Sequence, residues 1–422
     1  MKVIYIMAFS PMYHYYADEN ALIADSTYWW HTDTGQVVSA FDRDWAVIIG
    51  SRLTATTNQL QYEVWRPDDH ADREYSTTLA KGILHRSFPS EYVRTINGLR
   101  IGHQIDSPAL IRKLINILNA EKVIIMTQVT DKPLTRNIIK ACHNKAPVVF
   151  THFVNAAMLL PGFKKTKHPL IRLHYLLIER RRAALLSGVR YLTVSHYGCI
   201  EKLKEKYPAD ILFFTVGMDM NHYPELPSRS ELRDELGLRE NDFIILSSSR
   251  LVPEKQIDKI ILSIRSLVSH YPIKLIMTGH GPADYLVFLK QLVERYKLQN
   301  KVLFTGFIDE TRLNKYFKAS DVFFMGSEIE AGPLSTFIAL RYNVPVISTS
   351  TGLGFELLQK YNAGIIVGPY SYKEWTTAIE KILKGYQPAG IPLHQLMAEV
   401  DSSINTERLK DFLNKAYSDF YE

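Results

Sequence analysis

Short apolar runs alternate with longer amphipathic stretches throughout the C-terminal half of the chain. The apolar runs have the length of buried strands, and the amphipathic stretches have the apolar spacing of surface helices. The predicted strands are 242–249, 274–278, 301–305, 321–325 and 344–349, and the predicted helices are 256–270, 284–296, 310–319, 334–342 and 354–361. This alternation indicates βαβ units around a parallel sheet, which is the pattern of a Rossmann-like doubly wound domain.

The N-terminal half has the same alternation in a less regular form. Its predicted strands are 3–9, 46–50, 123–126, 147–150 and 191–194. Two insertions, 12–44 and 67–104, have no clear period, so we predict no element there. The halves meet near 217–227, which predicts an N-terminal domain over 1–220, a C-terminal domain over 221–400, and a final segment, 401–422, with a closing helix over 406–417.

Length and composition agree with two globular domains and exclude several classes of protein. A chain of 422 residues is too long for one hydrophobic core. Its two cysteines, Cys142 and Cys199, exclude a disulfide framework and a cysteine-rich metal site, and they fit a cytoplasmic protein. No apolar run reaches the length of about 18 residues that spans a bilayer. The net charge of +6 allows anionic ligands, but the basic residues are not interleaved with aromatic ones, so we expect no nucleic acid partner.

Candidate ligand chemistry gathers where the C-terminal strands end, which is where open α/β sheets bind ligands. Arg250 follows the first of these strands, and Lys255 opens the helix after it. Glu330 and the Gly332-Pro333 pair follow the fourth. Two cations and a helix N-terminus suit a diphosphate, and no aspartate pair suggests a metal. Any one of these features is more often an ordinary solvated turn, so the interpretation rests on their convergence.

At these residues the chain resembles family 4 of the GT-B glycosyltransferases, a group of retaining enzymes. The resemblance covers 191–367 and depends on four strings in order and spacing, which are 249–255, 279–282, 302–307 and 319–322. It implies a GT-B fold, in which two Rossmann-like doubly wound domains face each other across a cleft. It also implies that the C-terminal helix crosses back to the first domain.

The resemblance implies a role for individual residues. Arg250 and Lys255 would clamp the donor diphosphate, Glu330 would contact the transferred sugar, and His152 would touch that sugar from the first domain. The other donor contacts it implies are Gly279, His280, Phe307, Ile308, Gly332, Pro333, Leu334 and Ser335, with the backbone of Phe307 and Ile308 meeting the nucleobase.

The implied activity is retaining transfer of a sugar from a nucleotide-sugar. A UDP-sugar is the expected donor, with a GDP-sugar second. The expected acceptor is a glycan or a lipid-linked molecule in cell-surface polysaccharide or glycoconjugate biosynthesis. The clamp would supply most of the catalysis by stabilising the charge on the leaving diphosphate, so we expect no cofactor and no metal.

Two departures from the family pattern keep other functions open. Ile338 stands where a second glutamate usually binds the ribose, and 10–16 replaces a glycine-rich loop. A catalytically silent GT-B partner or regulator is therefore an alternative, although the presence of Arg250, Lys255 and Glu330 argues against lost donor binding. Another sugar-nucleotide enzyme, such as an epimerase, would need an acid–base pair that the sequence does not reveal.

Two further segments have both a functional and a structural interpretation. The stretch 164–182 mixes lysines and arginines with leucines and isoleucines. It is either a peripheral contact with the inner face of an anionic membrane or an ordinary amphipathic helix. The aromatic residues Tyr13, Tyr15, Tyr16, Tyr28, Trp29 and Trp30 either stack on an acceptor sugar or pack on the domain core.

Overall fold

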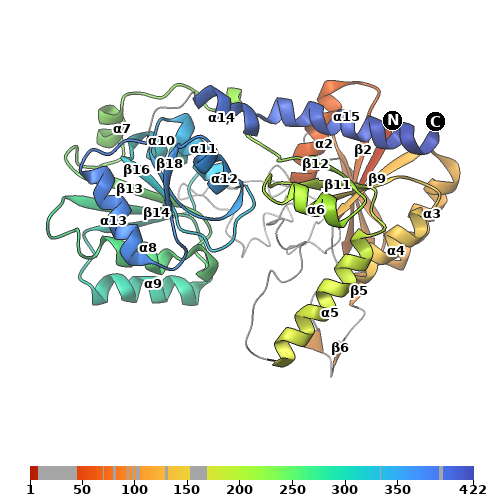
Figure 1. Cartoon of the computed structure of the whole chain (residues 1–422), viewed down its shortest axis with the longest axis horizontal. Helices are drawn as coiled ribbons and strands as arrows, with labels where there is room; N and C mark the ends of the chain where they lie inside the picture. The colour runs from red at the N-terminus through yellow and green to blue at the C-terminus, as the bar shows by residue number, and fades with distance from the viewer. Residues whose placement is uncertain are drawn as a thin grey trace. The chain divides into compact units, whose positions relative to one another are not determined.

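The computed structural model describes residues 1–7, 45–69, 71–78, 82–92, 95–96, 99–100, 105–128, 132–152, 169–332, 334–388 and 393–422. These residues form two compact units, each an α/β body (Figure 1). The first unit contains the described residues up to Val216 together with Ser403–Glu422. The second unit spans Gly217–Ser402.

The sheet of the first unit has the order β12-β11-β10-β9-β1-β2-β4-β3, and every neighbouring pair is parallel except β3 with β4. Its strands are β1 (Lys2–Ile6), β2 (Gln61–Asp68), β3 (Tyr75–Thr78), β4 (Leu84–Pro89), β9 (Val123–Gln128), β10 (Val148–His152), β11 (Tyr191–Val194) and β12 (Asp210–Phe213). Two short antiparallel pairs stand apart from it: β5 (Glu91–Tyr92) with β8 (Ile105–Asp106), and β6 (Thr95–Ile96) with β7 (Leu99–Arg100).

Side chains of the central strand β1 are buried on both faces of this sheet. Val3 and Tyr5 belong to the core on one face, whereas Ile4 and Ile6 belong to the core on the other, as the alternation of a strand requires. The helices of this unit are α2 (Trp45–Thr56), α3 (Pro108–Ala120), α4 (Pro133–Cys142), α5 (Pro169–Leu186) and α6 (Ile200–Lys206).

The predicted strand 46–50 is wrong, because these residues begin helix α2. The helix buries Ala46, Val47, Ile49, Gly50 and Leu53, a helical spacing that a short apolar run does not reveal by itself. The neighbouring strand β2 received no prediction because the polar residues Glu63, Arg66 and Asp68 interrupt its apolar pattern. All three are buried in the fold. The aromatic cluster at 13–30 and the segment 10–16 lie outside the described residues.

The sheet of the second unit is wholly parallel, with the order β15-β14-β13-β16-β17-β18. Its strands are β13 (Phe243–Ser248), β14 (Ile273–Thr278), β15 (Val302–Gly306), β16 (Val322–Met325), β17 (Val346–Thr349) and β18 (Gly364–Val367). The helices are α7 (Arg229–Glu235), α8 (Ile257–Ile264), α9 (Ala283–Arg295), α10 (Glu310–Ala319), α11 (Leu334–Arg341), α12 (Gly352–Lys360), α13 (Tyr372–Leu383) and α14 (Leu393–Val400), with short 3-10 turns η2 (Met220–His222) and η3 (Pro253–Lys255).

Every strand and helix predicted for the C-terminal half is confirmed in place, although α8 ends at Ile264 and not at residue 270. The elements α7, β18, α13 and α14 add to them. The core of this unit holds Ile245, Leu275, Phe324 and Trp375. With one parallel and one mostly parallel sheet, each covered by helices, the predicted fold class of two Rossmann-like doubly wound domains is confirmed.

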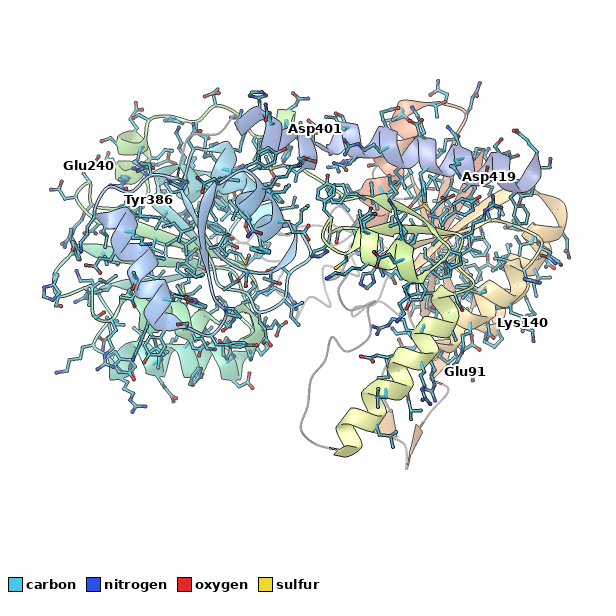
Figure 2. All side chains as sticks on the ribbon, in the orientation of Figure 1. Glu91, Lys140, Glu240, Tyr386, Asp401 and Asp419 are labelled. Atoms are coloured by element: carbon cyan, nitrogen blue, oxygen red, sulfur yellow. The ribbon has the colours of Figure 1, made fainter. Side chains whose placement is uncertain are left out.

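The last helix, α15 (Ser402–Tyr421), contains the predicted helical segment 406–417 and packs on the first unit. Leu409, Leu413 and Ala416 enter the core that also contains Val3 and Tyr5. The carbonyl oxygens of Val123 and Lys145 both lie 3.1 Å from the hydroxyl oxygen of Tyr421 and share its single proton. Figure 2 labels Asp401, just before this helix, and Asp419 near its end. The first unit is therefore completed by the C-terminus of the chain.

Candidate functional site

The strand order of the second unit creates one place where a ligand crevice is expected. From β13 the chain proceeds outward through β14 and β15, and it then returns to place β16 on the other side of β13. The loops after β13 and β16 therefore diverge, and ligands of open α/β sheets bind at such a switch point. Arg250 follows β13 and Glu330 follows β16, so both of these predicted site residues lie at the switch point.

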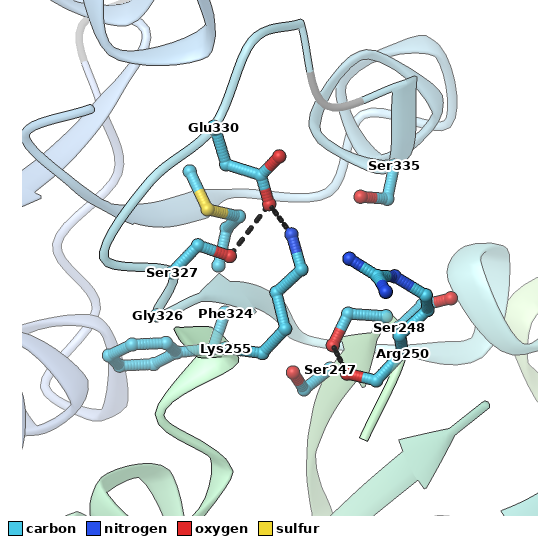
Figure 3. A pocket seen from close by; sticks show the side chains of 11 residues that line it. Ser247, Ser248, Arg250, Lys255, Phe324, Gly326, Ser327, Glu330 and Ser335 are labelled. Carbon is cyan, nitrogen blue, oxygen red and sulfur yellow. Dashed lines mark hydrogen bonds and ion pairs between the residues drawn. The ribbon is translucent and has the colours of Figure 1, made fainter. Parts of the chain in front are cut away.

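A pocket opens at this position and brings together four of the predicted site residues, as Figure 3 shows. They are Arg250, Lys255, Glu330 and Ser335. The remaining lining residues are Ser247, Ser248, Ser249, Phe324, Met325, Gly326 and Ser327. The cavity volume is about 210 Å³, which is below the range of whole small-molecule sites, so the pocket suits the phosphate part of a ligand better than an entire sugar nucleotide.

Lys255 and Glu330 form an ion pair at the centre of the pocket. The Lys255 ammonium donates to Oε1 of Glu330, and the two side chains are only 13% and 15% exposed. The hydroxyl of Ser327 donates to the same carboxylate oxygen at 2.7 Å. Since an ammonium has three donors, Lys255 keeps protons for a second partner while it holds Glu330.

The loop that carries Glu330 is itself held by threonines from the next strand end. The Glu330 backbone N–H donates to Oγ1 of Thr351 at 3.2 Å, and Oγ1 of Thr349 donates to the carbonyl of Ser327 at 2.6 Å. A Cβ on Gly352 would stand 2.9 Å from the Cβ of Glu330, so this position needs a glycine. The carboxylate is thus oriented before any ligand arrives.

Arg250 has a looser partner. Its guanidinium lies 3.3 Å from Oε1 of Glu254, and the two side chains are 56% and 44% exposed. Exposed pairs of this kind contribute about 0–1 kcal/mol, so an entering anion can take the guanidinium from Glu254 at little cost.

The glycines Gly279 and Gly281 pack closely against the backbone of the Arg250 loop. A Cβ on Gly279 would lie 1.9 Å from the carbonyl oxygen of Ser249, and one on Gly281 would lie 1.8 Å from that of Leu251. The Leu251 N–H donates to the carbonyl of His280 at 2.8 Å. This Gly-His-Gly turn therefore braces the loop next to the pocket, and the donor contacts that the resemblance implies for Gly279 and His280 stay a prediction.

Gln256 and Ser327 are two of the residues at the site that the sequence analysis missed. Gln256 adopts left-handed backbone angles, φ 51° and ψ 38°, directly after Lys255. Its buried amide donates to the Gly326 carbonyl at 3.0 Å, which ties the Lys255 turn to the β16 loop. A residue other than glycine with positive φ at a ligand site is a common sign of function, but it becomes visible only in the fold.

The other predicted donor residues that the structure describes are not among those lining this pocket. Leu334 begins α11 and is 42% exposed, and the side chain of Ile308, beyond β15, is only 5% exposed. Phe307 precedes Ile308, and Gly332 precedes Pro333, which lies outside the described residues. The predicted residue His152 ends β10 in the first unit and is 8% exposed.

Ile338 lies on α11 one turn after Ser335 and is 7% exposed. Three polar residues near Ile338 in the sequence could accept a hydrogen bond from the ribose in place of the missing glutamate, namely Glu328, Ser335 and Thr336. Thr336 is fully buried, and Glu328 hydrogen bonds to Tyr370, which raises the pKa of Tyr370 to about 12. Ser335 alone of the three lines the pocket, so it is the best placed substitute.

We predict that Ile338→Glu changes nucleotide affinity only modestly, because the carboxylate would enter a buried apolar position. Ser335→Ala is expected to weaken nucleotide binding more than Ile338→Ala does. Titration calorimetry with UDP on the three variants measures this. A gain of about tenfold or more for Ile338→Glu, roughly 1.4 kcal/mol, would show that no neighbour compensates.

Two absences can be stated for the described part of the chain. No group of three or more histidine, cysteine, aspartate or glutamate side chains there is arranged to hold a metal ion. Likewise, no helix among those residues is long and apolar enough to cross a membrane.

Comparison with known proteins finds a family match that lies within the second unit. Residues 228–395 match the family model described as "Glycosyl transferases group 1". The chain is 32% identical over 128 residues to the alpha-monoglucosyldiacylglycerol synthase of Streptococcus pneumoniae. That stretch covers 30% of this chain but only 29% of the relative.

Similarity of structure extends over nearly the whole chain. Anabaena Alr3699/HepE, solved in complex with UDP, superposes with a TM-score of 0.67 at 16% identity and covers 98% of this chain and 100% of its own. The same protein in complex with UDP-glucose gives a TM-score of 0.64 at 17% identity, again over 98% and 100% of the two chains.

Proposed function

Residues 228–395 of this chain form a glycosyl transferases group 1 domain within a GT-B fold, and we propose that the protein is a retaining glycosyltransferase that uses a UDP-sugar. The observation that carries this proposal is the pocket at the β13–β16 switch point, where Arg250 and Lys255 face a preoriented Glu330. UDP and UDP-glucose in a protein of similar fold support the choice of base.

The chemistry follows from the charges in the pocket. As the bond between sugar and diphosphate breaks, negative charge collects on the leaving diphosphate oxygen. The Arg250 guanidinium can donate two parallel hydrogen bonds to phosphate oxygens, and the Lys255 ammonium adds a point charge beside them. Such preorganised donors lower the barrier because they need no reorganisation during the reaction. Glu330 would contact the sugar hydroxyls, and His152 of the first unit is proposed to contact the same sugar.

For the acceptor we propose a glycan or a lipid-linked molecule in the synthesis of cell-surface polysaccharide or glycoconjugates. The similarity to a synthase named for a diacylglycerol product supports a lipid acceptor. A GDP-sugar is the second choice of donor.

Nucleotide binding and turnover test this function together. UDP, GDP and ADP are added separately to the full chain, and the melting temperature is recorded. UDP at about 100 times its Kd should stabilise the fold by about 2.7 kcal/mol. UDP-glucose and other UDP-sugars are then incubated with the protein, and release of UDP is measured. Stabilisation by no nucleoside diphosphate, with no release of one, would instead favour the silent partner or regulator.

We further predict that UDP release from a UDP-sugar survives EDTA at close to its full rate. The reason is that Arg250 and Lys255 supply the positive charge that a diphosphate requires. The rate is measured in buffer, in excess EDTA, and in EDTA followed by excess Mg²⁺ or Mn²⁺. Loss in EDTA with recovery on adding the metal would contradict a clamp made of side chains alone.

A further inference from the structure

Three leucines and two arginines form one exposed face of α5. Leu173, Leu176, Leu177, Arg180 and Arg181 are spaced three and four residues apart, so they project from the same side of the helix. The leucine side chains are 55%, 46% and 44% exposed in that order, and both arginines are exposed. We refer to these five residues as the leucine–arginine face.

The helix packs on its own unit through a different side. Leu186 is buried and Leu185 is partly buried, and both belong to the cluster that contains Phe150 and Leu192. In Figure 1 the end of α5 that carries the three leucines lies at the same end of the first unit as the short strand β6. The exposed leucines are therefore not the core-facing stripe of an ordinary amphipathic helix.

For the described part of 164–182, which begins at residue 169, this arrangement favours one of the two interpretations. An amphipathic helix of a globular domain turns its leucines inward and its charges outward. Here leucines and arginines share the outward side, and contiguous exposed apolar groups of this kind mark interaction sites. The charged residues of α5 are also mostly basic, since Glu179 is its single acidic residue.

We propose that the leucine–arginine face docks the protein on an anionic phospholipid bilayer. The leucines would enter the boundary between head groups and acyl chains, while the arginines bind lipid phosphates. A polyanion such as RNA would use the arginines but leave the leucines in water. A second copy of the chain would bury the leucines but would bring arginines together. A bilayer satisfies both kinds of side chain at once.

Vesicle sedimentation with the full chain tests this proposal without any sugar nucleotide, so its outcome does not depend on the proposed transferase activity. The vesicles contain either equal parts of phosphatidylglycerol and phosphatidylcholine or phosphatidylcholine alone. The protein should bind the anionic vesicles and lose that binding in high salt. Arg180→Gln with Arg181→Gln, and separately Leu173→Gln with Leu176→Gln and Leu177→Gln, should each lower the partition coefficient by at least about tenfold.

A matched control exists in the second unit. Val287 and Phe288 of α9 are 52% and 44% exposed, so Val287→Gln with Phe288→Gln removes exposed apolar side chains without touching α5. This control should bind vesicles as the unchanged protein does, and melting temperatures confirm that all variants fold. Failure of the unchanged protein to bind anionic vesicles, or equal binding by the leucine variant, overturns the proposal. So does light scattering that shows a dimer which the leucine variant converts to monomer while vesicles bind neither.

Discussion

Arg250→Ala and Lys255→Ala are each expected to lower sugar transfer by about 100- to 1000-fold, the scale for losing one preorganised charge donor in an active site. Both side chains line the pocket at the β13–β16 switch point, where a diphosphate would gather charge as it leaves. Lys255 should show the more complete loss, because its ammonium is held at the pocket centre by Glu330, whereas Arg250 is largely exposed. Steady-state rates of UDP release and of transfer measure both effects.

Lys259→Ala is the matched control for these variants. Lys259 lies one turn further along, on α8, and its ammonium stands 5.3 Å from the ring of Tyr370, outside the pocket lining. Lys259→Ala removes one positive charge from the same region, as Lys255→Ala does. Because Lys259 does not line the pocket, the rate of sugar transfer should stay close to that of the unchanged protein. Near-normal transfer by a folded Arg250→Ala, Lys255→Ala double variant would refute the clamp.

Glu330→Ala is expected to lower transfer by about 100-fold or more while leaving UDP binding as tight as before or tighter. The variant removes the proposed sugar contact, and it also releases the Lys255 ammonium from its carboxylate partner, so that ammonium becomes free for phosphate. In the absence of ligand, the largely buried Lys255 ammonium then lacks its carboxylate partner. We therefore expect the free energy of unfolding to fall by about 1–3 kcal/mol. Transfer rates, UDP titration and denaturant melts separate these three effects.

Two further variants show whether the carboxylate itself matters. Glu330→Gln keeps an oxygen for the Ser327 hydroxyl but loses the charge, so it should recover most of the stability and little of the activity. Glu328→Gln changes an exposed carboxylate in the same loop and should leave transfer nearly intact. If UDP affinity falls in Glu330→Ala as steeply as transfer does, Glu330 shapes the phosphate pocket rather than contacting the sugar.

The C-terminal sheet was predictable because each of its elements has a regular local pattern. Strands such as β13 and β16 are continuous apolar runs bounded by turns, and helices such as α10 begin with a capping residue, here Asp309. The first sheet was predicted less well for the opposite reason. Strand β2 buries charged residues that its neighbours satisfy, as Arg86 does for Glu63 at 2.9 Å. Such pairs involve residues far apart in sequence, so no local pattern signals them.

The composition of the pocket depended on tertiary structure. Sequence alone placed Arg250, Lys255 and Glu330 after strand ends, because a parallel α/β sheet presents all those ends at one edge. Which of them meet was decided by the strand order, which sets β16 beside β13 and so joins Lys255 to Glu330.

The helical period and the mixture of leucine with arginine in α5 were likewise evident from sequence. Which side of the helix faces water was not. The packing of Leu186 decides which side of α5 faces water. A helix turns toward the core the face that its neighbours can bury, and composition alone does not specify those neighbours.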